Sequence, residues 1–187
     1  LLMTGPPGCG KTLLARRFPD LLPALSREEA LDVARLRSAA GLPVDGLPSR
    51  RPFRAPSSGA SAAGVLGGGT PPRPCEFSLS YHGVLCLDEA PHFRGDVLEG
   101  LRAPLEDGRL TISRAGRALT VPARFQLLAA MNPCPCPHGG SPECRCTPGA
   151  KDRYRRRLSG PLVDRIDLRI AVAAVSFDKL RDASGGA

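Results

Sequence analysis

Short apolar runs alternate with helix-like stretches along the chain, and this order is typical of a sheet covered by helices. We predict strands where apolar residues predominate over a short run, at 1–3, 84–87, 125–131 and 168–172. We predict helices at 13–17, 26–40, 96–106 and 152–158. Apolar strands separated by helices favour a parallel sheet with helices on both faces, which is an α/β fold.

The helix at 26–40 has the clearest start signal. Ser26 and Glu29 have the spacing of a capping box, in which each side chain satisfies a free backbone N–H of the first turn. Within this helix we expect Leu31, Ala34 and Leu36 to be buried.

Proline and glycine interrupt the pattern in three places. Pro104 should end or kink the helix at 96–106, because proline has no N–H to donate. Alternating residues at 110–113 and 118–121 flank a glycine-containing turn and predict a β-hairpin. Residues 41–80 are rich in Gly and Pro and show neither period, so we expect a long irregular segment that is functional or mobile.

Residues 5–12 match the phosphate-binding loop pattern G-x-x-x-x-G-K-[ST] at every position, between an apolar run and a helical stretch. Glycines let backbone N–H groups converge on phosphates, and the helix N-terminus adds partial positive charge. Lys11 can reach the β- and γ-phosphates, and Thr12 can offer its hydroxyl to Mg²⁺. A plain turn before a helix is the alternative. The predicted loop comprises Gly5, Pro6, Pro7, Gly8, Cys9, Gly10, Lys11 and Thr12.

Polar groups also end two of the predicted strands. Asp88 and Glu89 follow the strand at 84–87, and in a phosphate-loop protein they would hold Mg²⁺ and activate the attacking water, respectively. We expect this pair at the tip of a strand neighbouring the one that leads into the loop. Asn132 follows the strand at 125–131, where it could bind the γ-phosphate or the water. The alternatives are a loop-opening Asp-Glu pair and a turn-forming Asn.

The 187 residues suit one domain, and they carry a formal net charge of +8. This charge favours a polyanionic partner such as nucleic acid, although a basic solvated surface is the alternative. No apolar run approaches the roughly 20 residues that span a bilayer, so no membrane partner is expected. A nucleotide-hydrolysing motif implies a cytoplasmic protein with reduced thiols.

Four of the seven cysteines form two close pairs, Cys134 with Cys136 and Cys144 with Cys146. Two such pairs joined by a short connection suit a tetrahedral, structural Zn²⁺ with metal–sulfur distances of about 2.3 Å. His138 could replace one ligand. Free thiols or a redox pair are the alternatives.

Longer strings narrow the family: RPFR at 51–54, GGG at 67–69, GVLCLDE at 83–89, MNPCPC at 131–136 and SGPLVDRID at 159–167. With the phosphate loop they resemble the YifB/ComM proteins, which are magnesium-chelatase-like AAA+ ATPases of the helix-2-insert clade. The resemblance covers about residues 1–172. Serines at 57 and 58 stand where relatives usually carry histidines, and Ala90 and His92 also depart from the usual residues.

The resemblance implies a three-layer αβα P-loop NTPase with a central parallel sheet, a helix-2 insertion within 41–80 and a pre-sensor-1 β-hairpin at 110–122. It implies an AAA+ core at 1–175, with a Cys-rich loop at 133–147, and a tail at 176–187. The N-terminal Lon-like domain and C-terminal lid of the relatives are not in this sequence, so we expect a truncated piece. It also implies ATP at the subunit interfaces of a hexameric ring and DNA translocation or branch migration in natural transformation.

By position, the resemblance makes 5–12 the Walker A loop, Asp88 and Glu89 the Walker B pair, and Asn132 sensor 1. It makes Arg165 the arginine finger for a neighbouring subunit, with an ion pair to Asp164 or Asp167 as the alternative. Arg114 and Arg117 of the hairpin become candidate DNA contacts, or else part of a solvated basic turn.

Three functions remain open from the sequence. The first is an ATP-driven motor acting on DNA. The second is a chelatase-type motor that remodels a protein or metal-insertion partner. The third is an inactive, truncated nucleotide-binding remnant.

Overall fold

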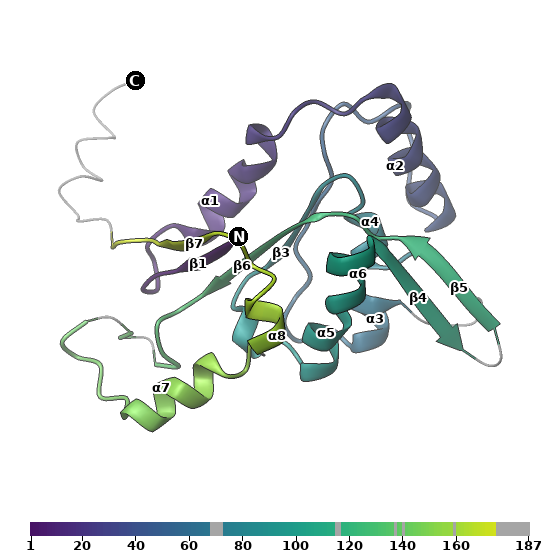
Figure 1. The fold of residues 1–187 in the computed structure, drawn as a ribbon. Helices are drawn as coiled ribbons and strands as arrows, with labels where there is room; N and C mark the ends of the chain where they lie inside the picture. Colours follow the sequence, from purple (N-terminus) through teal and green to yellow (C-terminus); the bar gives the residue numbers. More distant parts are fainter. Residues whose placement is uncertain (68–72, 115–116, 137, 140, 159, 175–187) are drawn as a thin grey trace, which may run out of the picture.

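The computed structural model describes residues 1–67, 73–114, 117–136, 138–139, 141–158 and 160–174. Its centre is a five-stranded parallel sheet in the order β2-β3-β6-β1-β7 (Figure 1). The strands are β1 Leu2–Thr4, β2 Phe53–Arg54, β3 Val84–Leu87, β6 Gln126–Met131 and β7 Arg169–Ala171. The predicted α/β fold with a parallel sheet is therefore confirmed.

Alternate residues of the strands enter two separate cores, one on each face of the sheet. In β3, Val84 and Cys86 pack toward the face covered by α1 (Lys11–Arg17), whereas Leu85 and Leu87 pack toward the opposite face. The second core contains Val65, Phe77, Val97, Leu98, Tyr154 and Leu162, together with Leu110, Ile112 and Val121 of the hairpin. Because both faces are covered at the centre of the sheet, β3 is buried throughout and β6 is buried from Leu127 to Met131, without the alternation of a half-exposed sheet.

Helix α2 (Arg27–Ala39) begins as predicted. Ser26 accepts a hydrogen bond from the Glu29 amide, and the Glu29 carboxylate accepts one from the Ser26 amide. The predicted burial of Leu31 is wrong, since Leu31 is exposed while Ala30 and Val33 are buried. Ala34 and Leu36 are only half-buried. Only one stripe of α2 packs, because the helix lies on the outside of the molecule beside α4 (Glu76–Leu79) (Figure 1).

The predicted helix at 96–106 is divided into α5 (Gly95–Gly100) and α6 (Arg102–Asp107), with the break at Leu101. Pro104 thus lies in the first turn of α6. Backbone N–H groups have no partner within the helix there, so the missing N–H of proline costs no hydrogen bond. Helix α7 (Pro148–Arg155) begins four residues before the predicted 152. The sequence contains a start signal for this helix that we missed. The Thr147 side chain caps the helix, and Pro148 occupies its first position.

The expectation of an irregular segment throughout 41–80 is wrong. This segment contains β2, α3 (Ala62–Leu66) and α4. Strand β2 has only two residues, paired as Phe53 with Val84 and Arg54 with Leu85, and so is too short to show a period. The remaining short helices are η1 (Phe18–Leu21), η2 (Ala90–His92) and α8 (Gly160–Val163).

The predicted hairpin is confirmed as β4 (Arg109–Arg114) and β5 (Arg117–Pro122), an antiparallel pair that projects to one side of the sheet (Figure 1). Leu110, Ile112 and Val121 anchor it in the second core. Residues 115–116 at its tip lie outside the described residues. Within the described ranges, no helix has the length and apolar character required to cross a bilayer.

Candidate nucleotide-binding and metal sites

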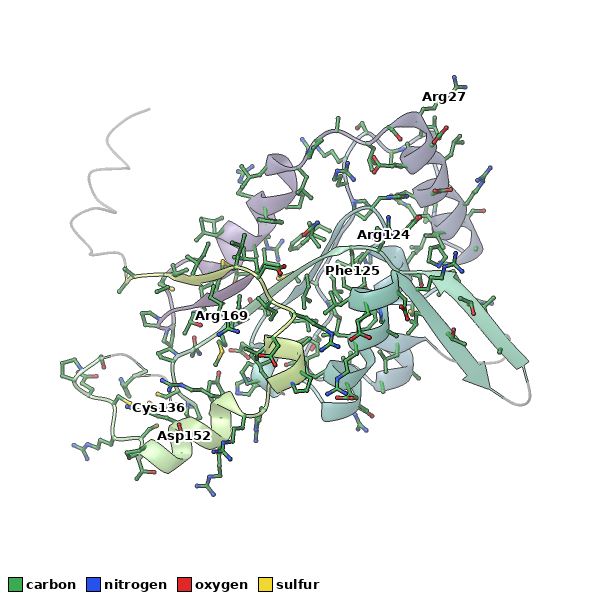
Figure 2. All side chains as sticks on the ribbon, viewed as in Figure 1. Arg27, Arg124, Phe125, Cys136, Asp152 and Arg169 are labelled. Carbon is green, nitrogen blue, oxygen red and sulfur yellow. The ribbon has the colours of Figure 1, made fainter. Side chains whose placement is uncertain are left out.

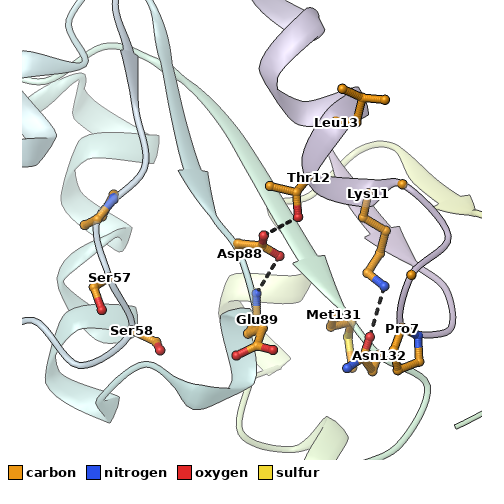
Figure 3. A pocket seen from close by; sticks show the side chains of 13 residues that line it. Pro7, Lys11, Thr12, Leu13, Ser57, Ser58, Asp88, Glu89, Met131 and Asn132 are labelled. Atoms are coloured by element: carbon orange, nitrogen blue, oxygen red, sulfur yellow. Dashed lines mark hydrogen bonds between the residues drawn. The ribbon is translucent and has the colours of Figure 1, made fainter. Parts of the chain in front are cut away.

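Four loops meet around a pocket of about 630 Å³ at the carboxyl edge of the parallel sheet (Figure 3). They are the loop after β1, which contains the predicted phosphate-binding residues, and the segments that follow β2, β3 and β6. This edge is where open α/β sheets bind ligands. The pocket brings together Lys11, Thr12, Asp88, Glu89 and Asn132.

The loop after β1 needs glycine for two different reasons. Gly8 and Gly10 have φ angles of 74° and 86°, in the left-handed region that side-chain-bearing residues avoid. A Cβ at either position would meet no atom within 4 Å, so backbone conformation rather than space selects glycine there. Gly5 is selected by space, because its Cβ would lie 2.3 Å from the Val172 carbonyl oxygen.

Lys11 is folded back onto its own loop. Its Nζ donates hydrogen bonds to the carbonyl oxygens of Gly5 and Pro6, both at 2.8 Å, and to Oδ1 of Asn132 at 3.0 Å. The ammonium therefore lies at the pocket wall and is fully hydrogen-bonded by weak, neutral acceptors. Phosphate oxygens are stronger partners for an ammonium, so this arrangement fits a triphosphate.

Thr12 and Asp88 meet across the sheet, with the Thr12 hydroxyl donating to Oδ2 of Asp88 at 2.6 Å (Figure 3). The other Asp88 oxygen accepts from the Glu89 amide at 3.0 Å. The expectation of a neighbouring strand is wrong, because β6 lies between β1 and β3. The contact forms because Thr12 belongs to α1, which lies over the sheet. A hydroxyl and a carboxylate side by side are the hard oxygen donors that suit Mg²⁺.

Glu89 has a φ of 53°, which is unusual for a residue with a side chain and costs about 1–3 kcal/mol. Its Oε2 lies 3.2 Å from Nδ1 of His92 (Figure 3 shows Glu89 beside Asp88). We missed this contact from the sequence, although the spacing of three residues was a signal for it. Ser57 and Ser58 line the opposite side of the pocket.

Arg165 lies in a different setting. It pairs with Glu106 of α6 and donates a hydrogen bond from Nη1 to the Pro161 carbonyl at 2.6 Å. The alternative of an ion pair with Asp164 or Asp167 is therefore wrong for the described structure. Arg165 does not line this chain's own pocket. Its role toward a neighbouring subunit stays a prediction.

The family model for magnesium chelatase, subunit ChlI, matches residues 1–180. This chain belongs to that family. Among relatives, the Escherichia coli (strain K12) protein called "Uncharacterized protein YifB" is 49% identical over 173 residues, which are 92% of this chain and 34% of the relative. "Competence protein ComM" of Haemophilus influenzae is 49% identical over 183 residues, which are 97% of this chain and 36% of ComM. The YifB/ComM resemblance is confirmed, and the chain spans about a third of the length of these relatives.

This ChlI-family chain also gathers the four clustered cysteines into one group, in which all Sγ atoms lie within 4.8 Å of one another. The Sγ of Cys134 is 3.2 Å from that of Cys136 and 3.4 Å from that of Cys144. A tetrahedral metal with sulfur ligands at about 2.3 Å would require sulfur–sulfur distances of about 3.8 Å, close to those observed. The group could therefore hold zinc with small adjustments. Cys136 and Asp152 of α7 lie at the same end of the molecule (Figure 2).

The cysteines differ in their proton affinity. Burial raises the pKa of Cys134 to about 12, whereas the backbone amide of Cys146 lowers the pKa of Cys144 to about 6. Because metal ions bind deprotonated thiols, Cys144 is the cysteine of this group best prepared to bind a metal at neutral pH. The suggestion that His138 replaces a ligand is wrong, because among the described residues the cluster contains cysteines alone. The Nδ1 of His138 instead lies 2.9 Å from Oε2 of Glu143.

Proposed function

We propose that this ChlI-family domain binds and hydrolyses Mg-ATP in the carboxyl-edge pocket, as the AAA+ motor of a cytoplasmic protein that acts on DNA. One observation carries the proposal. The Thr12–Asp88 and Lys11–Asn132 hydrogen bonds join residues that are 76 and 121 positions apart in the chain, and both face the same pocket. Membership of the ChlI family, which implies an ATPase, supports the same conclusion.

Each side chain of the pocket then has a specific task. Lys11 and the amides of the 5–12 loop hold the β- and γ-phosphates, and Thr12 and Asp88 are placed to hold Mg²⁺. When bound, Mg²⁺ would neutralise part of the negative charge of the phosphates. Glu89 orients the attacking water and accepts its proton, and Asn132 contacts the γ-phosphate or the water.

The test is ATP hydrolysis by the full-length protein, compared with its Glu89→Gln variant. We expect kcat to fall about 10²- to 10⁴-fold in the variant, because the general base is lost, while labelled ATP still binds. Glu28→Gln, the same change on the exposed start of α2, is the matched control. Unchanged hydrolysis in Glu89→Gln would remove Glu89 from this role. Binding without turnover in the wild-type protein would favour the inactive remnant.

DNA as the partner rests on three observations: the net charge of +8, the projecting hairpin with Arg114 and Arg117, and a close relative named as a competence protein. The side chains of these two arginines lie outside the described part of the structure. The family name keeps the second candidate, a motor for a metal-insertion partner, in consideration. An Arg114→Ala/Arg117→Ala variant should lose stimulation of ATPase activity by single-stranded DNA. Full stimulation in that variant would favour the second candidate.

Assembly into a hexameric ring is part of the proposal, with Arg165 completing a neighbouring subunit's site. Its place away from this chain's own pocket supports that arrangement. Mixing Arg165→Ala subunits with Lys11→Ala subunits tests it. In mixed rings some sites combine an intact pocket with an intact neighbouring arginine, so activity should return although each variant alone is inactive. No recovery would contradict the shared site.

We further propose that Cys134, Cys136, Cys144 and Cys146 hold one structural Zn²⁺. Metal analysis of the purified protein should find about one zinc per chain, since four thiolates complete one tetrahedral site. Zinc should be released on acidification, because protons compete with the metal for all four thiolates. A protein purified without zinc, or zinc unchanged in Cys144→Ser/Cys146→Ser, would contradict the site.

A further inference from the structure

The segment that carries Glu89 is a single tight turn. The amides of His92 and Phe93 donate to the carbonyl oxygens of Glu89 and Ala90, at 2.8 and 3.2 Å, and form the 3₁₀ turn η2. The first two residues of this turn, Ala90 and Pro91, are buried. The turn brings the imidazole of His92 back toward the residue that began it, so that Nδ1 lies 3.2 Å from Oε2 of Glu89.

A distant helix supports this turn at two points. The ring of Tyr154, on α7, is 4% exposed and meets the His92 ring edge-on, with 5.9 Å between centroids. Three residues later, just beyond the end of α7, Nη1 of Arg157 donates to the Pro91 carbonyl at 3.4 Å. Both contacts cross more than 60 positions of sequence, so only the folded chain makes them.

Tyr154 itself is anchored in the second core, and this burial raises the pKa of its phenol. The chain between Asn132 and α7 is the cysteine-rich loop, which starts at Cys134 and ends one residue before Thr147, the cap of α7. The helix that contacts the turn of Glu89 is therefore joined through this loop to the segment that carries Asn132.

We infer that His92 is a positioning residue for Glu89, and that Tyr154 and Arg157 hold the turn that carries both in place. The inference rests on the proposed ATPase function. A general base must lie within about 2.6–3.2 Å of the water it deprotonates. With one carboxylate oxygen held by His92, the other is left to face the pocket in a restricted orientation. Loss of this hold should slow the chemical step without weakening nucleotide binding.

Steady-state ATP hydrolysis by the full-length protein tests the role of His92. His92→Ala should lower kcat about tenfold and leave KM and the dissociation constant for labelled ATP unchanged. His92→Gln, which can still donate to Glu89, should restore part of the rate. In a Glu89→Gln background, His92→Ala should have no further effect, since it acts through Glu89. A wild-type kcat in His92→Ala, or an equal loss of ATP affinity, would overturn the inference.

Hydrogen–deuterium exchange tests the supporting role of α7 without requiring turnover. Arg157→Ala should accelerate amide exchange several-fold in peptides covering 89–93, whereas Arg155→Ala, at the exposed last residue of α7, should not. Tyr154→Leu is the second variant, since it removes the ring that meets His92. Unchanged exchange in both test variants would overturn the role of α7. Inactivity of the wild-type protein would instead overturn the proposed function, and with it the role of His92, so the two failures are distinguishable.

Discussion

The two edges of the parallel sheet each hold a cluster of charged side chains, but the clusters are organised differently. At the amino edge, Arg51 is 13% exposed and donates to the carbonyl oxygens of Pro23 and His82 at 2.6 and 2.7 Å. It also pairs with Glu29 of α2 at 3.2 Å. At the carboxyl edge, Lys11 and Thr12 bond to Asn132 and Asp88, which line an open pocket of about 630 Å³. The amino-edge pocket beside Arg51, Arg124 and Phe125 is about 230 Å³ (Figure 2 labels the last two).

The comparison separates a structural cluster from a candidate binding site made of similar residue types. Arg51 links Glu29 of α2 to the loop before α2 and to the loop before β3. Its hydrogen bonds are therefore satisfied within the fold, without a bound ligand. His82 belongs to the same cluster, with Glu29 at 3.5 Å and Asp32 at 3.4 Å. Lys11 instead bonds to its own loop and to Asn132, and these partners can be exchanged for phosphate oxygens.

Lys11→Ala should show the largest difference between the two edges of the sheet. Because an ammonium–phosphate hydrogen bond contributes about 1.5–3 kcal/mol, ATP affinity should fall about 10- to 150-fold. The free energy of unfolding should change little, because Lys11 bonds mainly within its own loop. Titration with labelled ATP and urea unfolding measure the two effects. Full ATP affinity in this variant would mean that the carboxyl-edge pocket is not the nucleotide site.

Arg51→Ala should have the opposite effect. Removing one member of a buried ion pair typically costs 3–5 kcal/mol, and partial exposure of Glu29 reduces this to about 2 kcal/mol. ATP affinity should stay within about twofold of wild type, since Arg51 lies at the far edge of the sheet. Arg51→Lys should recover little stability, because lysine lacks the planar fork that reaches several acceptors at once. A collapse of ATP affinity with unchanged stability would remove the distinction between the two edges.

The smallest expected effect is a loss of folding stability at low pH that depends on Glu29. The Ser26 amide, and then Arg51, hold the pKa of Glu29 below its usual range. The stabilisation from the ionised carboxylate is therefore present above the ordinary carboxyl pKa and is lost as the pH falls through the lowered pKa of the folded state. Between about pH 6 and about pH 3, urea unfolding of the wild-type protein should lose more stability than that of Glu29→Gln. Parallel losses in the two proteins would exclude Glu29 as a source of acid sensitivity.

The sequence predicted the parts of this molecule that depend on local chemistry. The capping box at Ser26, the strands β3 and β6 and the hairpin all have short-range signals, and the structure confirms these elements. The phosphate loop has an equally short signal, and its binding role stays a prediction. The burial of Leu31 and the irregularity of 41–80 were wrong, because helix orientation and the two-residue strand β2 depend on neighbours distant in sequence.

Contacts between distant charged residues could not be predicted. For Arg165 the sequence suggested Asp164 or Asp167 rather than Glu106. The contacts of His82 with Glu29 and Asp32 were not predicted. Many acidic residues are close to each arginine or histidine in a chain this charged, and spacing does not choose among them. Only the packing of helices on the sheet brings one partner within hydrogen-bond distance.

By itself, the sequence determined which chemical groups are present and where turns, caps and strands occur, because backbone geometry is governed by residues within a few positions. The strand order β2-β3-β6-β1-β7 was decided by the tertiary structure, as was the meeting of Thr12 with Asp88 across an intervening strand. So was the support of Glu89 by His92 and α7. These features depend on burying both faces of one sheet, and that free energy is shared by the whole chain rather than by any segment.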